Sequence, residues 1–284
     1  MPSIENQDWD TVIESKQQGL EFGIKEIWHY RDLLWLFVLR DFVSFYKQTI
    51  LGPFWFFIQP LFTTAIYIFL FRNLANLSTD GIPGPLFYIV GITIWSYFSE
   101  TLSKVSNVLR DNASIFGKVY FPRMIMPLSI VFSSLFKLGV QLILLALIML
   151  YFILFEEGVS INYKLVYFPF LILVVAFQSL GFGMIVAAFT SKYRDFAMLL
   201  GFGLQLLMYA TPVIYPLSSI TGIWKIILSL NPMTTVVECM RLCLFGKGTV
   251  TASGISYMIF VTLIVFFIGF IVFRRTEKNF VDTI

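Results

Sequence analysis

Charged side chains are scarce in this sequence. Aspartate, glutamate, lysine and arginine make up 13% of its 284 residues, while hydrophobic residues make up 58%. Soluble domains carry about 25% charged residues, so the composition indicates a polytopic membrane protein. The net charge is only +3, and the basic residues are spread along the chain. Nothing therefore indicates a nucleic-acid-binding surface.

Residues that catalyse reactions or bind metals are also few. His29 is the only histidine, and the two cysteines, Cys239 and Cys243, lie one helical turn apart. A disulfide at that spacing is geometrically awkward, and a metal site would need two further ligands. Glu100 is the only acidic residue well inside an expected span, four residues before Lys104, with which it can pair. Proton-driven carriers normally bury acidic residues. We expect no catalytic residue, metal or cofactor in this chain, and an energy source outside it.

The segment 31–48 is hydrophobic but cannot span a membrane. Its longest uncharged run, Leu33–Leu39, is seven residues, against the roughly 20 that a bilayer requires. From Val38 onward, apolar side chains share one helical face, while Arg40, Ser44 and Lys47 share another. This pattern is typical of an amphipathic helix that lies in the membrane surface.

Longer apolar runs follow, and they predict an all-α protein with six transmembrane helices. The runs are Leu51–Phe71, Leu86–Val108, Met124–Phe155, Leu165–Phe189, Ala197–Tyr215 and Ala252–Phe273. The third is too long for a bilayer, so we expect its first part to project into the cytoplasm. Glycine pairs within the fourth and fifth runs (Gly181 and Gly183, Gly201 and Gly203) indicate close helix packing.

The connecting segments predict the topology. Lysine and arginine are more frequent in the N-terminal segment and in every second connection than in the connections between them, which favours a cytoplasmic location for both termini. The first 27 residues carry several acids and no apolar core, so we expect no cleavable signal peptide. Between the last two runs, Ile223–Leu230 and Val236–Phe245 are short helical candidates separated by Asn231-Pro232. We interpret them as outer re-entrant helices.

Several motifs together resemble a known family. They are Arg40-Asp41, the run Tyr46-Lys47-Gln48-Thr49-x-Leu51-Gly52-Pro53-x-Trp55, Gln59-Pro60, Lys118–Arg123, Tyr193-Arg194-Asp195, Tyr215-Pro216 and Asn231-Pro232-Met233. In this order, from about residue 28 to residue 276, they are similar to type-2 ABC permeases that export polysaccharides. These are the membrane subunits of O-antigen, capsule and teichoic-acid exporters. The extension 1–27 is longer than in many members and has no assigned function.

The resemblance implies partners and a location. It implies a homodimer bound to two copies of a separate ABC nucleotide-binding subunit, which binds ATP and Mg²⁺, so that this chain is not itself an enzyme. The cargo would be an undecaprenyl-linked glycan, with O-antigen favoured, and the location the bacterial inner membrane. Residues 1–50 would form the cytoplasmic segment with the interfacial helix, and residues 51–284 the permease domain. The residues expected to couple to the ATPase are Arg40, Asp41, Tyr46, Lys47, Phe116, Lys118, Tyr120, Phe121 and Arg123.

Aromatic side chains crowd the first two predicted spans. Pyranose rings present C–H faces that stack weakly on aromatic rings, which suits a polymer that slides. We therefore expect Trp55, Trp95, Tyr97 and Phe98 to line a channel. Membrane anchoring and core packing are competing explanations for each of them.

Three alternative functions remain open from the sequence. A type-2 ABC permease for a small lipophilic drug or lipid would share the fold but not the cargo. A membrane enzyme such as an acyltransferase would need a catalytic histidine constellation, and His29 is the only histidine. A channel or receptor without energy coupling would leave the basic, aromatic segment Arg110–Arg123 unexplained.

Overall fold

The computed structural model describes most of the chain, and every regular element in the described part is a helix. The described residues are 24–44, 47, 49–116, 118–119, 121–156, 162–193 and 195–280, with side chains described for all of them except 24, 25 and 278–280. The predicted all-helical class is confirmed over these residues.

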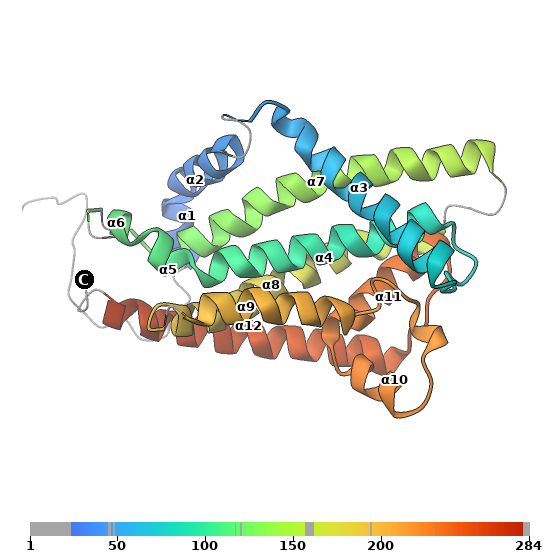
Figure 1. The fold of residues 1–284 in the computed structure, drawn as a ribbon. Helices are drawn as coiled ribbons and strands as arrows, with labels where there is room; N and C mark the ends of the chain where they lie inside the picture. The colour runs from blue at the N-terminus through green and yellow to red at the C-terminus, as the bar shows by residue number, and fades with distance from the viewer. Residues whose placement is uncertain are drawn as a thin grey trace, which may run out of the picture.

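The long helices run side by side as one bundle (Figure 1). They are α4 Gly84–Ser106, α7 Ile125–Phe155, α8 Phe168–Thr190, α9 Asp195–Tyr209 and α12 Ala252–Phe280. One end of the bundle holds the short helices α5 Val108–Asp111 and α6 Ala113–Phe116, and we call it the α5–α6 end. The opposite end holds α10 Gly222–Ser229 and α11 Pro232–Phe245, and we call it the α10–α11 end.

Four helical segments are long and apolar enough to cross a membrane. They are Gly52–Leu74, Ile125–Phe155, Tyr163–Thr190 and Ala252–Glu277. The pair α10 and α11, bent by 93°, would be a fifth if it is one broken span. These four segments correspond to the predicted first, third, fourth and sixth spans, so the chain is a multi-pass membrane protein.

The predicted second and fifth spans form helices α4 and α9, which are not among the four segments that are long and apolar enough to cross a membrane. The reason differs between the two. Helix α4 has 23 residues but includes Glu100 and Lys104, and its neighbours α3, α7 and α8 pack around it. A helix shielded by other helices does not need an unbroken apolar sequence. Helix α9 has 15 residues, which corresponds to only about 22 Å of helix, less than the roughly 30 Å of a bilayer core.

The second N-terminal helix lies against α7. After α1 (Ile24–His29), helix α2 (Arg31–Ser44) packs mainly on α7 and buries Phe37 and Val38. A turn at Gly52, whose φ of 52° is a conformation that glycine tolerates best, then leads into the first long segment. This segment comprises a 3₁₀ turn at Gly52–Phe54, helix α3 at Trp55–Tyr67 and a π-helical turn at Ile68–Leu74.

The break between α10 and α11 follows from two residues. The Asn231 side chain caps α11 by accepting a hydrogen bond from the backbone N–H of Met233 at 3.0 Å, and its amide donates to Thr211 Oγ1 at 2.8 Å. Pro232 occupies the first turn of α11, where its missing N–H is not needed. The two predicted short helices are therefore present, and α11 begins at Pro232, four residues before the expected Val236.

Small residues allow α8 and α12 to approach closely. A Cβ atom on Gly269 would lie 2.4 Å from the carbonyl oxygen of Gly181. On the other side of α8, a Cβ atom on Gly183 would lie 2.7 Å from Cβ of Val105 in α4. The expected close packing is confirmed for α8. It is not seen for Gly201 and Gly203 of α9, because no atom of the described residues contacts a Cβ atom placed on either of them within 4 Å.

Candidate functional site

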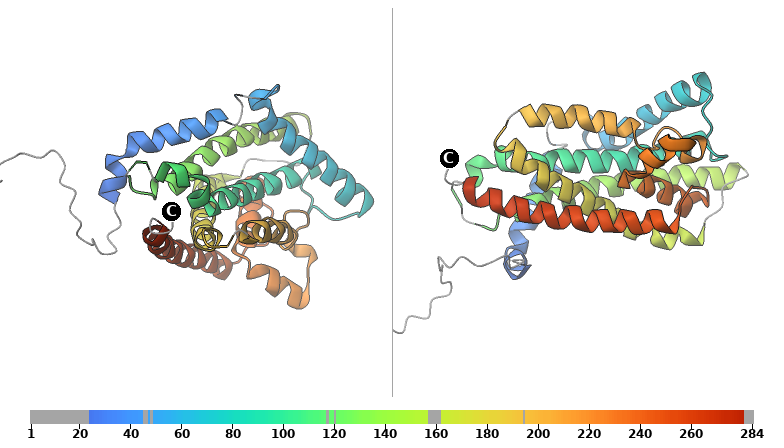
Figure 2. Two further views of the ribbon diagram at one scale, coloured as in Figure 1. Left: turned by 60° about the vertical axis from the view of Figure 1, so that its left-hand side comes forward. Right: turned by 90° about the horizontal axis from the view of Figure 1, so that it is seen from below.

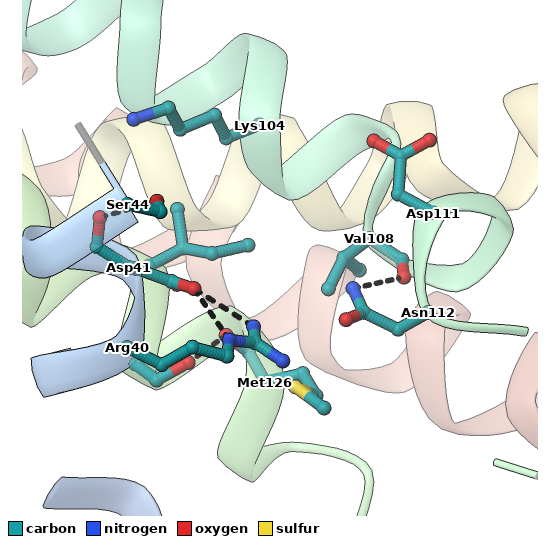
Figure 3. Close-up of a pocket in the computed structure, with 10 residues that line it drawn as sticks. Arg40, Asp41, Ser44, Lys104, Val108, Asp111, Asn112 and Met126 are labelled. Carbon is teal, nitrogen blue, oxygen red and sulfur yellow. Dashed lines mark hydrogen bonds and ion pairs between the residues drawn. The ribbon is translucent and has the colours of Figure 1, made fainter. Parts of the chain in front are cut away.

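A polar hollow of about 240 Å³ lies at the α5–α6 end, where α2, α7 and the junction of α4 with α5 meet (Figure 3). Its lining includes charged groups of both signs, Arg40 and Lys104 together with Asp41 and Asp111. Asn112 turns its amide to the carbonyl of Val108 at 3.0 Å. The hollow therefore brings the predicted coupling pair Arg40-Asp41 next to the start of residues 108–123. This segment contains α5 and α6, and we call it the α5–α6 loop.

Arg40 and Asp41 form a close pair. Arg40 donates from Nε and Nη2 to Asp41 Oδ1 at 2.9 and 2.8 Å. The Arg40 guanidinium also lies 4.8 Å from the centre of the Phe37 ring. The pair is thus held by α2 itself, and its side chains are partly exposed at the edge of the hollow.

Phe121 is not on the surface, although we expected it to couple to the ATPase, which would require it to be accessible. Its side chain is 5% exposed, and its ring lies 5.8 Å from Phe37 of α2 and 5.8 Å from Phe116. Burial against these two rings removes apolar area from water, which is more favourable than leaving the ring exposed. Among the described residues of this segment, the exposed large apolar side chain is Val119, at 57%.

Arg123 also points inward. Its Nη1 donates to the backbone carbonyl of Glu277 at 2.7 Å, and its guanidinium lies 5.2 Å from the centre of the Phe116 ring. This contact could not be predicted from the sequence, because Glu277 lies 154 residues further along the chain.

The remaining predicted coupling residues fall into three groups. Lys47 and Lys118 are exposed, whereas Tyr46 and Tyr120 lie outside the described residues. Phe116 is partly buried against the core. The structure therefore places Arg40, Asp41, Phe116, Phe121 and Arg123 in one neighbourhood, with Lys118 on its outer side.

Three of the four predicted channel aromatics are in the core instead. Trp95, Tyr97 and Phe98 of α4 are 5%, 3% and 2% exposed, and Phe98 packs edge-on against Phe182 of α8. As placed here, they cannot touch a polymer outside the protomer, because α4 is enclosed by its neighbours. Trp55 differs, with 47% of its surface exposed on α3.

Glu100 has two cationic partners. The predicted pair with Lys104 is confirmed, with Nζ 2.8 Å from Oε1, and Lys137 of α7 approaches the other oxygen at 2.5 Å. One carboxylate thus joins α4 to α7 and faces two ammonium groups. The contact with Lys137 was missed, because only the packing of α7 on α4 brings it close.

A buried ion pair at the α10–α11 end was also missed. Glu238 and Arg241 of α11 have side chains that are each 1% exposed, and their closest charged atoms are 3.3 Å apart. Arg241 donates to the carbonyl of Val213 at 2.9 Å, and its guanidinium lies 3.6 Å from the centre of the Phe87 ring. The sequence feature that could have indicated this pair is the spacing of Glu238 and Arg241, three residues apart in an otherwise apolar helix.

The Glu238 carboxylate binds backbone N–H groups from the segments on both sides of α10 and α11. It accepts hydrogen bonds from the N–H of Leu217 at 3.2 Å and from the N–H of Thr249 at 2.8 Å. Together with the contacts of Arg241, these bonds connect the segment before α10, the segment after α11 and the start of α4. The α10–α11 end is therefore held together by one internal ion pair.

The fold and these two ends define a helical, multi-pass membrane protein. Residues 32–245 match the ABC-2 type transporter family, and the chain belongs to this family. The predicted resemblance to type-2 ABC permeases is thereby confirmed.

The chain is also similar to named permeases along most of its length. It is 27% identical to the O-antigen export system permease protein RfbA of Myxococcus xanthus over 265 residues, 92% of this chain and 98% of the relative. It is 26% identical to a protein of the same name from Klebsiella pneumoniae, covering 88% and 94%. It is 22% identical to the polysialic acid transport protein KpsM of Escherichia coli, covering 84% and 92%.

Proposed function

We propose that this chain is the membrane subunit of an ATP-driven exporter that moves a lipid-linked polysaccharide, with O-antigen favoured, across the bacterial inner membrane. The observation that carries this proposal is the similarity to O-antigen export permeases over almost the full length of both chains. ATP would be hydrolysed, with Mg²⁺, by a separate subunit present in two copies.

The proposed assembly is a homodimer. Helix α9 has no buried residue among its 15, and a second copy would cover exposed apolar side chains such as Phe202 and Leu206. Helices α3 and α9 lie along the same edge of the bundle (Figure 2, right), where Tyr67 contacts Met208. A second copy seated on this edge would also bring Trp55 close to the path of an undecaprenyl-linked glycan.

The proposed topology has six spans. Helix α4 crosses enclosed by α3, α7 and α8 of its own chain, and α9 crosses together with the residues up to Tyr215, covered by the second copy. The α5–α6 end and both termini face the cytoplasm, and α10 and α11 form the outer re-entrant pair. Residues 1–50 form the cytoplasmic segment with the interfacial helix, and residues 51–284 form the permease domain.

The direct test is reconstitution with the partner. The chain is co-expressed with an ABC ATPase from the same gene cluster in a bacterium that lacks its own O-antigen permease. We expect the two proteins to co-purify and O-antigen to reach the surface, and an ATPase inactivated at its phosphate-binding lysine to abolish export. Co-purification with ATPase activity that responds to a lipophilic drug, and not to the lipid-linked glycan, would favour the small-substrate permease.

The topology gives a labelling prediction. Ser44 and Lys47 are exposed, and the native cysteines Cys239 and Cys243 are buried, so they should give little background. Ser44→Cys and Lys47→Cys should react with a membrane-impermeant thiol reagent in inverted inner-membrane vesicles but not in intact spheroplasts. Reaction in spheroplasts alone would reverse the topology.

The exposed side of the α5–α6 loop gives a docking prediction. Val119→Glu places a charge where Val119 is 57% exposed, so it should leave the fold intact while disrupting an apolar contact with the ATPase. Loss of a buried anchor weakens binding by about 2 kcal/mol or more, roughly 30-fold in affinity. Co-purified ATPase, measured at equal permease amounts, should fall accordingly, and an unchanged ratio would place the docking surface elsewhere.

A further inference from the structure

The side chain of Arg123, in the α5–α6 loop, is hydrogen-bonded to the last turn of α12. The carbonyl groups of the last turn of a helix have no partner within the helix. In α12, which ends at Phe280, the carbonyl of Glu277 receives its hydrogen bond from Arg123 at 2.7 Å. A cation at this position also interacts favourably with the helix dipole. The side chain of Arg123 is 12% exposed, so it is largely withdrawn from solvent and from any docking partner.

From Arg123 a continuous row of rings and cations leads to α2. The Arg123 guanidinium packs over Phe116, the ring of Phe116 lies against Phe121, and Phe121 lies against Phe37. The Arg40 guanidinium in turn lies 4.8 Å from the centre of the Phe37 ring. The row therefore joins the last helix, the loop and the N-terminal helix through side chains in direct contact.

We propose that Arg123 is a positioning residue for energy coupling, which fixes the end of α12 to the α5–α6 loop so that the loop, α2 and α12 move together. This inference rests on the proposed function, in which the loop receives the movement of the ATPase. It assigns Arg123 an inward role, whereas the sequence suggested that it contacts the partner. An arginine suits this role because its planar guanidinium can donate to a carbonyl and stack on a ring at the same time.

The test separates docking from coupling. In membranes that contain the chain with its ATPase, Arg123→Gln should retain wild-type amounts of bound ATPase and ATP hydrolysis. The polysaccharide exported per ATP hydrolysed should fall between about 2-fold and about 30-fold, the range that mutations along coupling networks produce. Arg123→Lys can still reach the carbonyl but loses the planar stack, so its ratio should lie between those of Arg123→Gln and the wild type.

The matched control is Arg275→Gln, which removes an exposed arginine two residues before Glu277 on the same helix and should leave the ratio unchanged. The graded effect of lysine also distinguishes positioning from a general loss of folded protein, which would lower ATPase binding and export in parallel. Loss of ATPase binding in Arg123→Gln at normal membrane levels would mean that Arg123 contacts the partner directly, and the inference would be wrong. A wild-type ratio in Arg123→Gln would also overturn it. Failure of the wild-type chain to bind any ATPase would overturn the proposed function and this inference with it.

Discussion

Replacing Glu238 by alanine should destabilise the protein by about 3–5 kcal/mol, the usual effect of removing one partner from a buried ion pair. Arg241 would then be a buried cation without its carboxylate, and the N–H groups of Leu217 and Thr249 would lose their acceptor. Thermal unfolding of the detergent-solubilised chain, followed by tryptophan fluorescence, measures the change.

Two further variants show whether charge is the cause. Glu238→Gln keeps an acceptor oxygen but not the charge, so it should be less destabilising than alanine. The double variant Glu238→Gln/Arg241→Met removes both charges and should recover part of the stability, because apolar replacements of buried pairs are often tolerated. Asp111→Asn, in an ion pair with half-exposed side chains, should change the free energy of unfolding by less than about 1 kcal/mol. Equal stability of Glu238→Ala and Asp111→Asn would refute this account of the α10–α11 end.

Replacing Gly269 by alanine should have the second large effect. The added methyl group would lie 2.4 Å from the carbonyl oxygen of Gly181, and backbone atoms cannot move aside as side chains do. Helices α8 and α12 would have to separate, and we expect a loss near the upper end of the about 1–3 kcal/mol typical of overpacking. The same unfolding measurement applies.

Gly139 of α7 provides the control for this second prediction. It is also a helical glycine, but no atom of the described residues contacts the position of its Cβ within 4 Å. Gly139→Ala should therefore be neutral or slightly stabilising, because alanine is the better helix former. A destabilisation as large as that of Gly269→Ala would mean that the close contact between α8 and α12 is not the cause.

For the candidate coupling residues, the sequence predicted which residues lie together but not the direction in which their side chains point. Two motifs and the aromatic, basic segment Arg110–Arg123 predicted nine coupling residues, and the structure brings five of them together: Arg40, Asp41, Phe116, Phe121 and Arg123. Their orientation was not predictable from the motifs. Phe121 and Arg123 face inward because Phe37 and the end of α12 offer them contacts, and both contacts join segments that are distant in the sequence.

The sequence by itself determined the membrane class, the all-helical fold, the family and the break at Asn231-Pro232. These depend on composition, on apolar run length and on short motifs, all of which are local. Only the tertiary structure decided which side chains are enclosed. Trp95 and Phe98 are aromatic residues in an apolar run like Trp55, but they are buried because α4 is surrounded by α3, α7 and α8. Likewise, the charged pair Glu238 and Arg241 is buried only because Phe87, Val213, Leu217 and Thr249 converge on it from other segments.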